Sequence, residues 1–108
     1  MSSVRAPTSQ VFHAIADPKR RQILDLLLAG ERPVGELVPH LGVSMGAVSQ
    51  HLRVLREAGL VKQRKDGRHR RYRVEPAPLR QVVDWTEPYT RFWKGRLRRL
   101  GSYLDGKR

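Results

Sequence analysis

Residues 44–59 read SMGAVSQHLRVLREAG and carry both the start and the stop signal of one helix. Ser44 is a typical N-cap residue, and Gly59 is typical of the left-handed position that ends a helix. At about 100° per residue, one side is apolar and is expected to face the core through Val48, Leu52 and Leu55. The opposite side starts with small residues and has no acid until Glu57. The stretch predicts an amphipathic helix whose exposed face is small and uncharged at its start.

Three shorter helices are expected before this one. Apolar residues at helical spacing place them at residues 9–16, 18–29 and about 34–41. The pair Asp17-Pro18 is a cap followed by a helix start, and Gly42 leaves a tight turn before Ser44. The third and fourth helices therefore form a helix-turn-helix. Arg20 lies near the start of the second helix, where its charge opposes the dipole and where solvent or a phosphate would relieve it.

A short β-hairpin is expected after Gly59, in the sequence LVKQRKDGRHRRYRV at residues 60–74. Asp66-Gly67 is predicted to form its two-residue turn, which pairs Lys65 with Arg68, Arg64 with His69 and Val61 with Tyr72. Seven Lys or Arg residues and one acid lie between positions 62 and 73. Since these charges repel one another, they indicate a surface that meets a polyanion.

The last helix is predicted to begin at Leu79, after the stiff connector 75–78. Its apolar residues recur at steps of three and four, as an amphipathic seam of Val82, Val83, Thr86, Tyr89, Trp93, Leu97, Leu100 and Leu104. This seam is larger than one small domain can cover. Pro39 in the third helix and Pro88 in the last are expected to kink or shorten their helices.

The totals indicate a single small cytoplasmic domain with a polyanionic partner. The 108 residues carry 22 Lys plus Arg against 10 Asp plus Glu, a formal charge of +12. With no cysteine, thiolate catalysis and thiol metal sites are excluded. No apolar run is long enough to cross a membrane, and the N-terminus has no signal-peptide pattern. Residues 1–8 are expected to be flexible, 9–104 to form the domain, and 105–108 to form a tail.

The segments AVSQHLRVLREAGLV and RKDGRHRRYRV resemble the winged helix-turn-helix of the ArsR-type bacterial repressors. DPKRRQILDLL and DWTEPYTRFWKGRLRRL are similar to a metal-independent branch of that family, and the resemblance covers roughly residues 10 to 104. It implies a mostly α-helical fold of four helices, a basic hairpin that acts as the wing, and a long fifth helix. It also implies a DNA-binding transcriptional repressor, often of its own gene, and no enzyme.

In such a protein the helix at 44–59 enters the DNA major groove with its N-terminus first. Its DNA-binding residues are expected to be Ser44, Gly46, Ala47, Ser49, Gln50, His51 and Arg53. Gly46 and Ala47 leave room for base edges, and Gln50 is suited to paired hydrogen bonds with adenine. Two alternatives stay open for His51, which is either a structural hydrogen-bonding residue or a phosphate contact.

The wing is expected to bind DNA through phosphates and the minor groove. Arg68, His69 and Arg70 at its tip are the predicted groove residues, and Arg64 and Arg71 are the predicted backbone contacts. Phosphate contacts position a protein without reading sequence, so affinity should fall steeply with salt.

Neither a metal nor another cofactor is expected. The stretch ERPVGEL has Pro33 and Gly35 where metal-sensing relatives have thiols, and the four histidines form no pair at ligand spacing. No nucleophile motif, phosphate loop or carboxylate pair indicates catalysis.

The resemblance implies a homodimer in which the first and last helices pair across a two-fold axis. The interface residues expected are Phe12, Val83, Tyr89, Trp93, Leu97, Leu100 and Leu104. Such a dimer would bind double-stranded DNA at an inverted repeat. Two other functions agree with the same sequence. One is a regulator with a small hydrophobic effector, of unknown identity, between the C-terminal helices; the other is a basic protein that coats nucleic acid without specificity.

Overall fold

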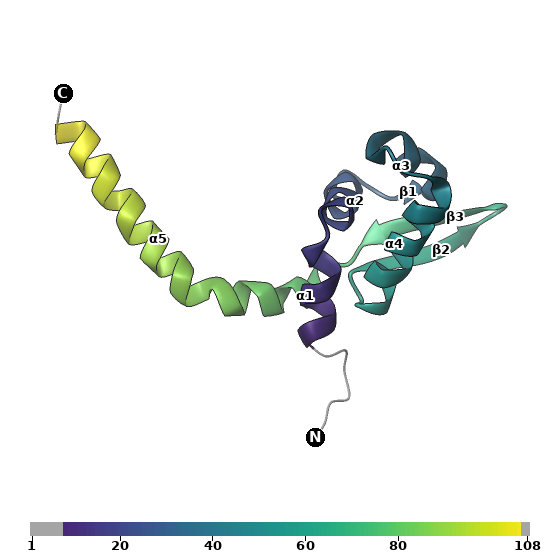
Figure 1. Ribbon diagram of the computed structural model, residues 1–108, viewed down its shortest axis with the longest axis horizontal. Coiled ribbons are helices and arrows are strands. Elements are labelled where there is room, and N and C mark those ends of the chain that lie inside the picture. The colour runs from purple at the N-terminus through teal and green to yellow at the C-terminus, as the bar shows by residue number, and fades with distance from the viewer. Residues whose placement is uncertain (1–7, 107–108) are drawn as a thin grey trace, which may run out of the picture.

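A computed structural model describes residues 8–106 of the chain, and the side chains of residues 9–101 (Figure 1). The N-terminal segment and the C-terminal tail expected from the sequence lie mostly outside these residues. The elements in chain order are α1 (Thr8–Ala16), α2 (Pro18–Leu28), β1 (Arg32–Pro33), α3 (Val34–Leu41), α4 (Met45–Glu57), β2 (Val61–Asp66), β3 (His69–Val74), a 3-10 turn η1 (Ala77–Leu79) and α5 (Arg80–Gly106). The winged helix-turn-helix is therefore confirmed.

Local capping signals account for the helix ends. The Asp17 carboxylate accepts hydrogen bonds from the backbone N–H groups of Lys19 (2.7 Å) and Arg20 (3.3 Å), and Pro18 starts α2. Ser44 Oγ accepts from the N–H of Ala47 at 3.1 Å, at the start of α4. Gly42 and Gly59 have φ of +66° and +78° after α3 and α4. These two glycines supply the left-handed conformation that ends each helix.

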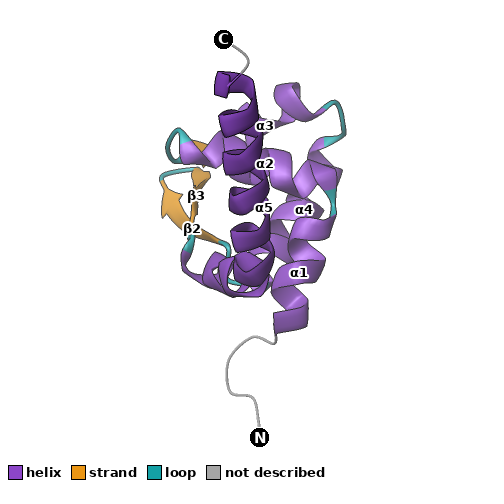
Figure 2. Ribbon diagram, turned by 90° about the vertical axis from the view of Figure 1, so that its left-hand side faces the viewer, coloured by secondary structure: helices purple, strands orange, loops and turns teal. Residues whose placement is uncertain are grey.

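One apolar core joins α1–α4 to the base of the hairpin. The buried stripe predicted for α4 is confirmed, because Val48, Leu52 and Leu55 are all at most 1% exposed. The complete core consists of Val11, Ala14, Ile23, Leu24, Leu27, Leu37, Leu41, Val48, Leu52, Leu55, Ala58, Leu60, Val61 and Tyr72. With α5 facing the viewer, Figure 2 shows the hairpin on one side of this body and α1 and α4 on the other. The core thus fixes α4 relative to the wing.

The predicted hairpin is present, but its predicted turn and register are wrong. The turn residues are Gly67 and Arg68, so that Asp66 pairs with His69 and Val61 pairs with Val74. Gly67 has φ +63°, and no described residue other than glycine has positive φ. A glycine in the first turn position followed by negative φ fits a type II′ turn, whereas the predicted Asp-Gly turn needs positive φ at both residues.

A third strand, β1, was not predicted. Arg32 and Pro33 pair with Tyr72 and Arg71, which gives a three-stranded antiparallel sheet in the order β1-β3-β2. Pro33 is tolerated because β1 is an edge strand. The strand places the preceding residue, Glu31, beside the wing.

The last helix leaves the body and carries an exposed apolar seam. α5 runs away from the rest of the fold and changes direction along its length (Figure 1), and Pro88 lies inside it. Near the body, Trp85 packs edge-to-face on Phe12 of α1, with ring centroids 5.6 Å apart. Large apolar side chains stay uncovered along the helix: Val83, Trp85, Tyr89, Phe92, Trp93, Leu97 and Leu100 are each 53% to 62% exposed. None of the helices in the described part of the chain is long and apolar enough to span a bilayer.

Candidate nucleic-acid interface

The exposed side of α4 and one face of the wing form the walls of an open cleft with a volume of about 440 Å³. Its lining is polar and basic, and comprises Gly46, Ser49, Gln50, Arg53, Arg56, Gln63, Arg70 and Tyr72. We call this surface the helix–wing cleft. Four of the predicted reading residues of α4 line it, together with one residue predicted for the wing.

On the α4 side, the cleft is open where the helix begins. A side-chain carbon added at Gly46 would meet no atom closer than Ser44 Oγ at 3.9 Å, and Gly46 does not have positive φ. The fold therefore does not require glycine there, although glycine weakens a helix relative to alanine. Gln50 and Ser49 are exposed beside it. A base edge can come closer to this part of α4 than to a helix that carries long side chains at the same positions.

The remaining α4 positions have defined surroundings. Ser44 is exposed and caps the helix, while Ala47 is half-buried. Arg53 is exposed and pairs with Glu57 one turn later, at 3.3 Å between Nε and Oε2. Since an exposed pair of this kind is worth little, a phosphate can compete for Arg53.

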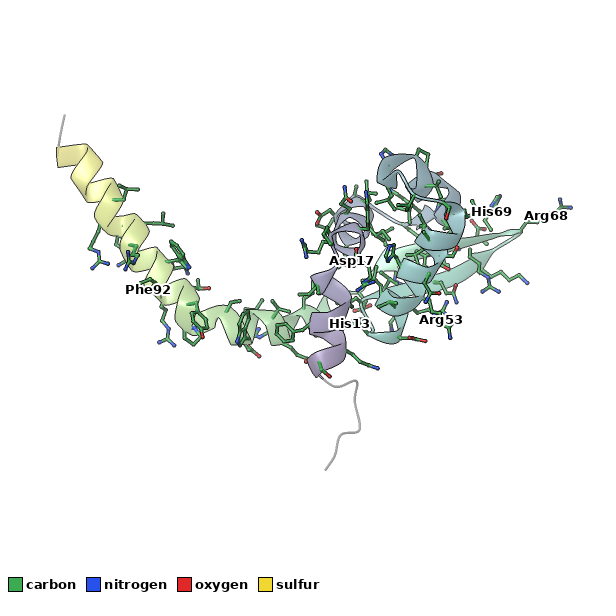
Figure 3. The ribbon with its side chains drawn as sticks, in the orientation of Figure 1. His13, Asp17, Arg53, Arg68, His69 and Phe92 are labelled. Carbon is green, nitrogen blue, oxygen red and sulfur yellow. The ribbon has the colours of Figure 1, made fainter. Side chains whose placement is uncertain are left out.

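Strand alternation sorts the wing residues onto two faces. Arg70 and Tyr72 lie on the face that lines the helix–wing cleft, opposite Lys65 and Gln63 in the ladder. His69 and Arg71 lie on the other face. Figure 3 places Arg68 and His69 at the free end of the hairpin. The three residues predicted as one tip group therefore point in different directions.

Arg64 and Arg71, the predicted backbone contacts, both bind Glu31. Arg64 Nη2 lies 2.8 Å from Glu31 Oε1, and Arg71 Nε lies 3.4 Å from the same oxygen. The hydrogen bond from Arg64 is the largest effect that lowers the pKa of the Glu31 carboxyl, and the same bond raises the pKa of Arg64. The two arginines are thus held against the body in the free protein, and their contact with a DNA backbone stays a prediction.

The expectation that solvent or a phosphate would relieve the charge of Arg20 is wrong. Its side chain is buried and donates to the carbonyls of Ala14 (2.7 Å, from Nε) and His13 (3.0 Å, from Nη2) at the end of α1. Its Nη1 lies 3.3 Å from Nδ1 of His51, which is half-buried. His51 therefore has a structural partner, although a phosphate contact through its other nitrogen stays open.

Three cleft residues were not predicted from the sequence: Arg56, Gln63 and Tyr72, the last of which was expected only at the base of the hairpin. Arg56 lies one turn after Arg53 on the exposed side of α4, a spacing that could have identified it. Gln63 has a buried Oε1 without a hydrogen-bond partner among the described residues. Gln63 pairs with Tyr72 and lies on the same face of the wing as Arg70, so strand alternation could have identified it as a cleft residue.

The predicted dimer residues lie where an interface could form, although nothing in the single chain tests them. Val83, Tyr89, Trp93, Leu97 and Leu100 belong to the exposed seam, and Phe12 is half-buried against Trp85. Leu104 lies outside the residues with described side chains. Across the described residues, His, Asp and Glu form no group of three that could hold a metal ion.

Comparison with known proteins agrees with this geometry. Residues 17–63 match the family described as bacterial regulatory protein, arsR family. The chain is 40% identical to the HTH-type transcriptional regulator Rv2034 of Mycobacterium tuberculosis, over 99% of this chain and 96% of that protein. It is 34% identical to the transcriptional repressor SdpR of Bacillus subtilis, over 71% of this chain and 86% of SdpR.

Solved structures give the same result. The solution structure of the homodimeric winged helix-turn-helix DNA-binding domain Mb0332 from Mycobacterium bovis, a possible ArsR-family transcriptional regulator, aligns with a TM-score of 0.62 and 34% identity. The alignment covers 73% of this chain and 79% of that domain. The resemblance seen in the sequence is thus confirmed, and the protein belongs to the ArsR family of bacterial regulatory proteins.

Proposed function

We propose that this protein is a homodimeric DNA-binding transcriptional repressor that binds an inverted-repeat operator. Each α4 would enter a major groove, and each wing would follow the adjacent backbone and minor groove. The observation that carries the proposal is the helix–wing cleft, in which the open reading face of α4 and a basic face of the wing share one concave surface. Repression would follow from occlusion of the promoter.

The charge distribution supports a polyanionic partner at the wing. Arg64 and Arg71 pair with acidic residues, but five other wing cations form no ion pair with a described residue: Lys62, Lys65, Arg68, Arg70 and Arg73. Unpaired like charges on one hairpin repel each other, and phosphates would relieve that repulsion. The α4 side contributes Gln50 as a reading residue, since its amide can donate to and accept from one base.

The exposed apolar residues of α5 support a dimer, and a two-fold dimer suits an inverted repeat. Seven large apolar side chains of α5, between Val83 and Leu100, are each more than half exposed, and contiguous exposed apolar patches mark interaction sites. Pairing this seam about a two-fold axis would relate two α4 helices by the same symmetry as an inverted repeat. The homodimeric neighbour supports the pairing of two copies, and the relatives named as regulators support a role in transcription.

The test is a comparison of three nucleic acids. Fluorescence anisotropy would measure the binding of the full chain to DNA from upstream of its own gene, to random DNA and to duplex RNA, across a salt titration. We expect the upstream fragment to bind at least about a thousandfold more tightly than random DNA, as specific sites do. Equal affinity for all three would instead indicate a protein that coats nucleic acid without specificity.

A further inference from the structure

The contact between Arg20 and His51 has no part in the function proposed above. Arg20 is 9% exposed and lies where α1 ends, α2 begins and α4 passes. Its Nε and Nη2 donate to two carbonyls of α1, its Nη1 lies 3.9 Å from Asp17 Oδ2, and the same Nη1 lies 3.3 Å from His51 Nδ1. A buried guanidinium with this many partners has a fixed position.

The chemistry of Arg20 determines which nitrogen of His51 carries the proton. A guanidinium has five N–H donors and no acceptor, so it can bond to Nδ1 only when Nδ1 carries no proton. In a neutral imidazole the proton is then on Nε2. Nε2 of His51 has no hydrogen-bond partner among the described residues, and the residue is half-exposed. His51 is therefore an N–H donor on the side of the ring away from Arg20.

We propose that Arg20 is a positioning residue for DNA binding, which holds His51 in the Nε2–H form so that His51 donates to a DNA phosphate oxygen. The inference rests on the proposed function, since it needs DNA beside α4. His51 follows Gln50 directly and thus borders the reading face. A donor at that border suits the backbone that flanks a groove entered by α4, because phosphates accept most protein–DNA hydrogen bonds.

The same residue connects the reading helix with the helix that packs on α5. The carbonyls of His13 and Ala14 belong to the last turn of α1, where the helix dipole favours a cation. α1 also carries Phe12, which packs on Trp85 of α5. Arg20 therefore ties the orientation of His51 to α1, and α1 in turn contacts α5.

The tautomer can be measured in the free full-length protein. Two-bond 15N–1H correlation spectra at neutral pH should show His51 with a protonated Nε2 and a bare Nδ1. A predominant Nδ1–H form, or an equal mixture of the two forms, would overturn the proposal. Because this measurement needs no DNA, it does not depend on the proposed function.

Two matched variants test whether the Nε2 proton reaches DNA. In His51→Gln the side-chain amide extends to about the position of Nε2, whereas in His51→Asn it reaches only the position of Nδ1. We expect His51→Gln to bind operator DNA within about threefold of wild type and His51→Asn to lose about tenfold or more, the usual effect of a lost hydrogen bond to a charged group. Equal affinities of the two variants would contradict the role of Nε2.

Removal of the guanidinium tests Arg20 itself. Arg20→Met should allow both tautomers of His51 and weaken DNA binding about tenfold, and His51→Gln in the same background should restore the binding. Circular dichroism checks that Arg20→Met folds. If Arg20→Met does not fold, the proposal is tested by the tautomer of His51 in the wild type and by the two His51 variants. No binding of any DNA by wild type would overturn the proposed function and the phosphate role of His51, but not the Nε2–H assignment.

Discussion

At the scale of single residues, Gln50 is the reading residue that the geometry favours. It is exposed on α4, lines the helix–wing cleft, and has the small Gly46 one turn before it. Gln50→Ala should relax the preference for one base pair in each half-site, a loss of about 1–3 kcal/mol of discrimination. Competition binding with operators mutated at each position measures this loss.

The matched control for Gln50 is Gln22→Ala. Gln22 is also an exposed helical glutamine, but it lies on α2 and does not line the cleft. Base preference at every position should be unchanged in this control. If Gln50→Ala leaves the preferences unchanged as well, then Gln50 does not read a base.

Arg70 differs from Gln50 in that it should contribute affinity without specificity. It is exposed, forms no ion pair with a described residue, and faces α4 across the cleft. Arg70→Ala should weaken binding to operator and random DNA by similar factors, and should lower the slope of log affinity against log salt by about one. Anisotropy titrations at several salt concentrations measure both quantities.

Arg98→Ala is the control for Arg70, since it removes the same charge from the exposed surface of α5. It should change the salt slope much less, because it lies far from the wing. A base-dependent loss in Arg70→Ala would instead assign Arg70 to sequence reading in the minor groove.

At the scale of elements, the wing is held by an acidic residue that precedes the two-residue strand β1. Glu31 pairs with Arg64 and Arg71, and these pairs hold the two cations against the body. Glu31→Gln removes the carboxylate, raises the net charge by one, frees Arg64 and leaves Arg71 with only its 3.8 Å pair to Asp66. We expect binding to all DNA to become about three- to tenfold tighter at low salt and the salt slope to become steeper, because more phosphates are neutralised.

A charge-matched control separates local release from total charge. Asp84→Asn makes the same change of charge on α5, where Asp84 pairs with Arg80 at 3.1 Å. It should have a smaller effect on DNA affinity. If Glu31→Gln weakens binding instead, the two arginines stabilise the conformation of the wing and do not bind the DNA backbone.

The elements differ in how far the sequence could predict them. The ends of α2, α3 and α4 were predicted because their caps are local: Asp17, Ser44 and the two left-handed glycines act within a few residues of themselves. The hairpin register was wrong because Asp66-Gly67 and Gly67-Arg68 both place glycine at a turn, so the local sequence does not distinguish the two turns. β1 was missed because two residues have no periodicity and pair with a strand distant in sequence.

The candidate site shows the same division. The α4 face follows from helical periodicity, so the sequence alone predicts Gly46, Ser49, Gln50 and Arg53 as members of one surface. The role of Arg20 could not be predicted in this way, because its partners are backbone carbonyls of another helix and one ring nitrogen. Such partners leave no pattern in the sequence.

At the scale of the whole molecule, α5 is an arm that the rest of the fold does not cover. Figure 3 shows Phe92 on the outer part of this helix, away from the body. Its ring packs against that of Trp93, with centroids 6.2 Å apart, while both side chains stay more than half exposed. A second copy of the chain is the partner that would bury this cluster in a symmetric arrangement.

Trp93→Ala therefore should weaken the dimer and leave the body folded. Trp93 is 60% exposed and is absent from the core of α1–α4 and the hairpin. Central interface tryptophans often contribute about 2 kcal/mol or more, so we expect the dimer dissociation constant to rise at least about tenfold. Sedimentation equilibrium measures that constant, and circular dichroism tests whether the helices persist.

The same variant connects assembly with DNA recognition. An inverted repeat is bound tightly because two half-sites are engaged at once, whereas a single half-site needs only one α4 and one wing. Trp93→Ala should therefore lose affinity for the full inverted repeat and keep its affinity for a half-site, and Lys94→Ala should change neither. A dimer unaffected by Trp93→Ala would place the interface elsewhere, and an equal loss on both DNAs would mean that the substitution disturbs α4 and the wing themselves.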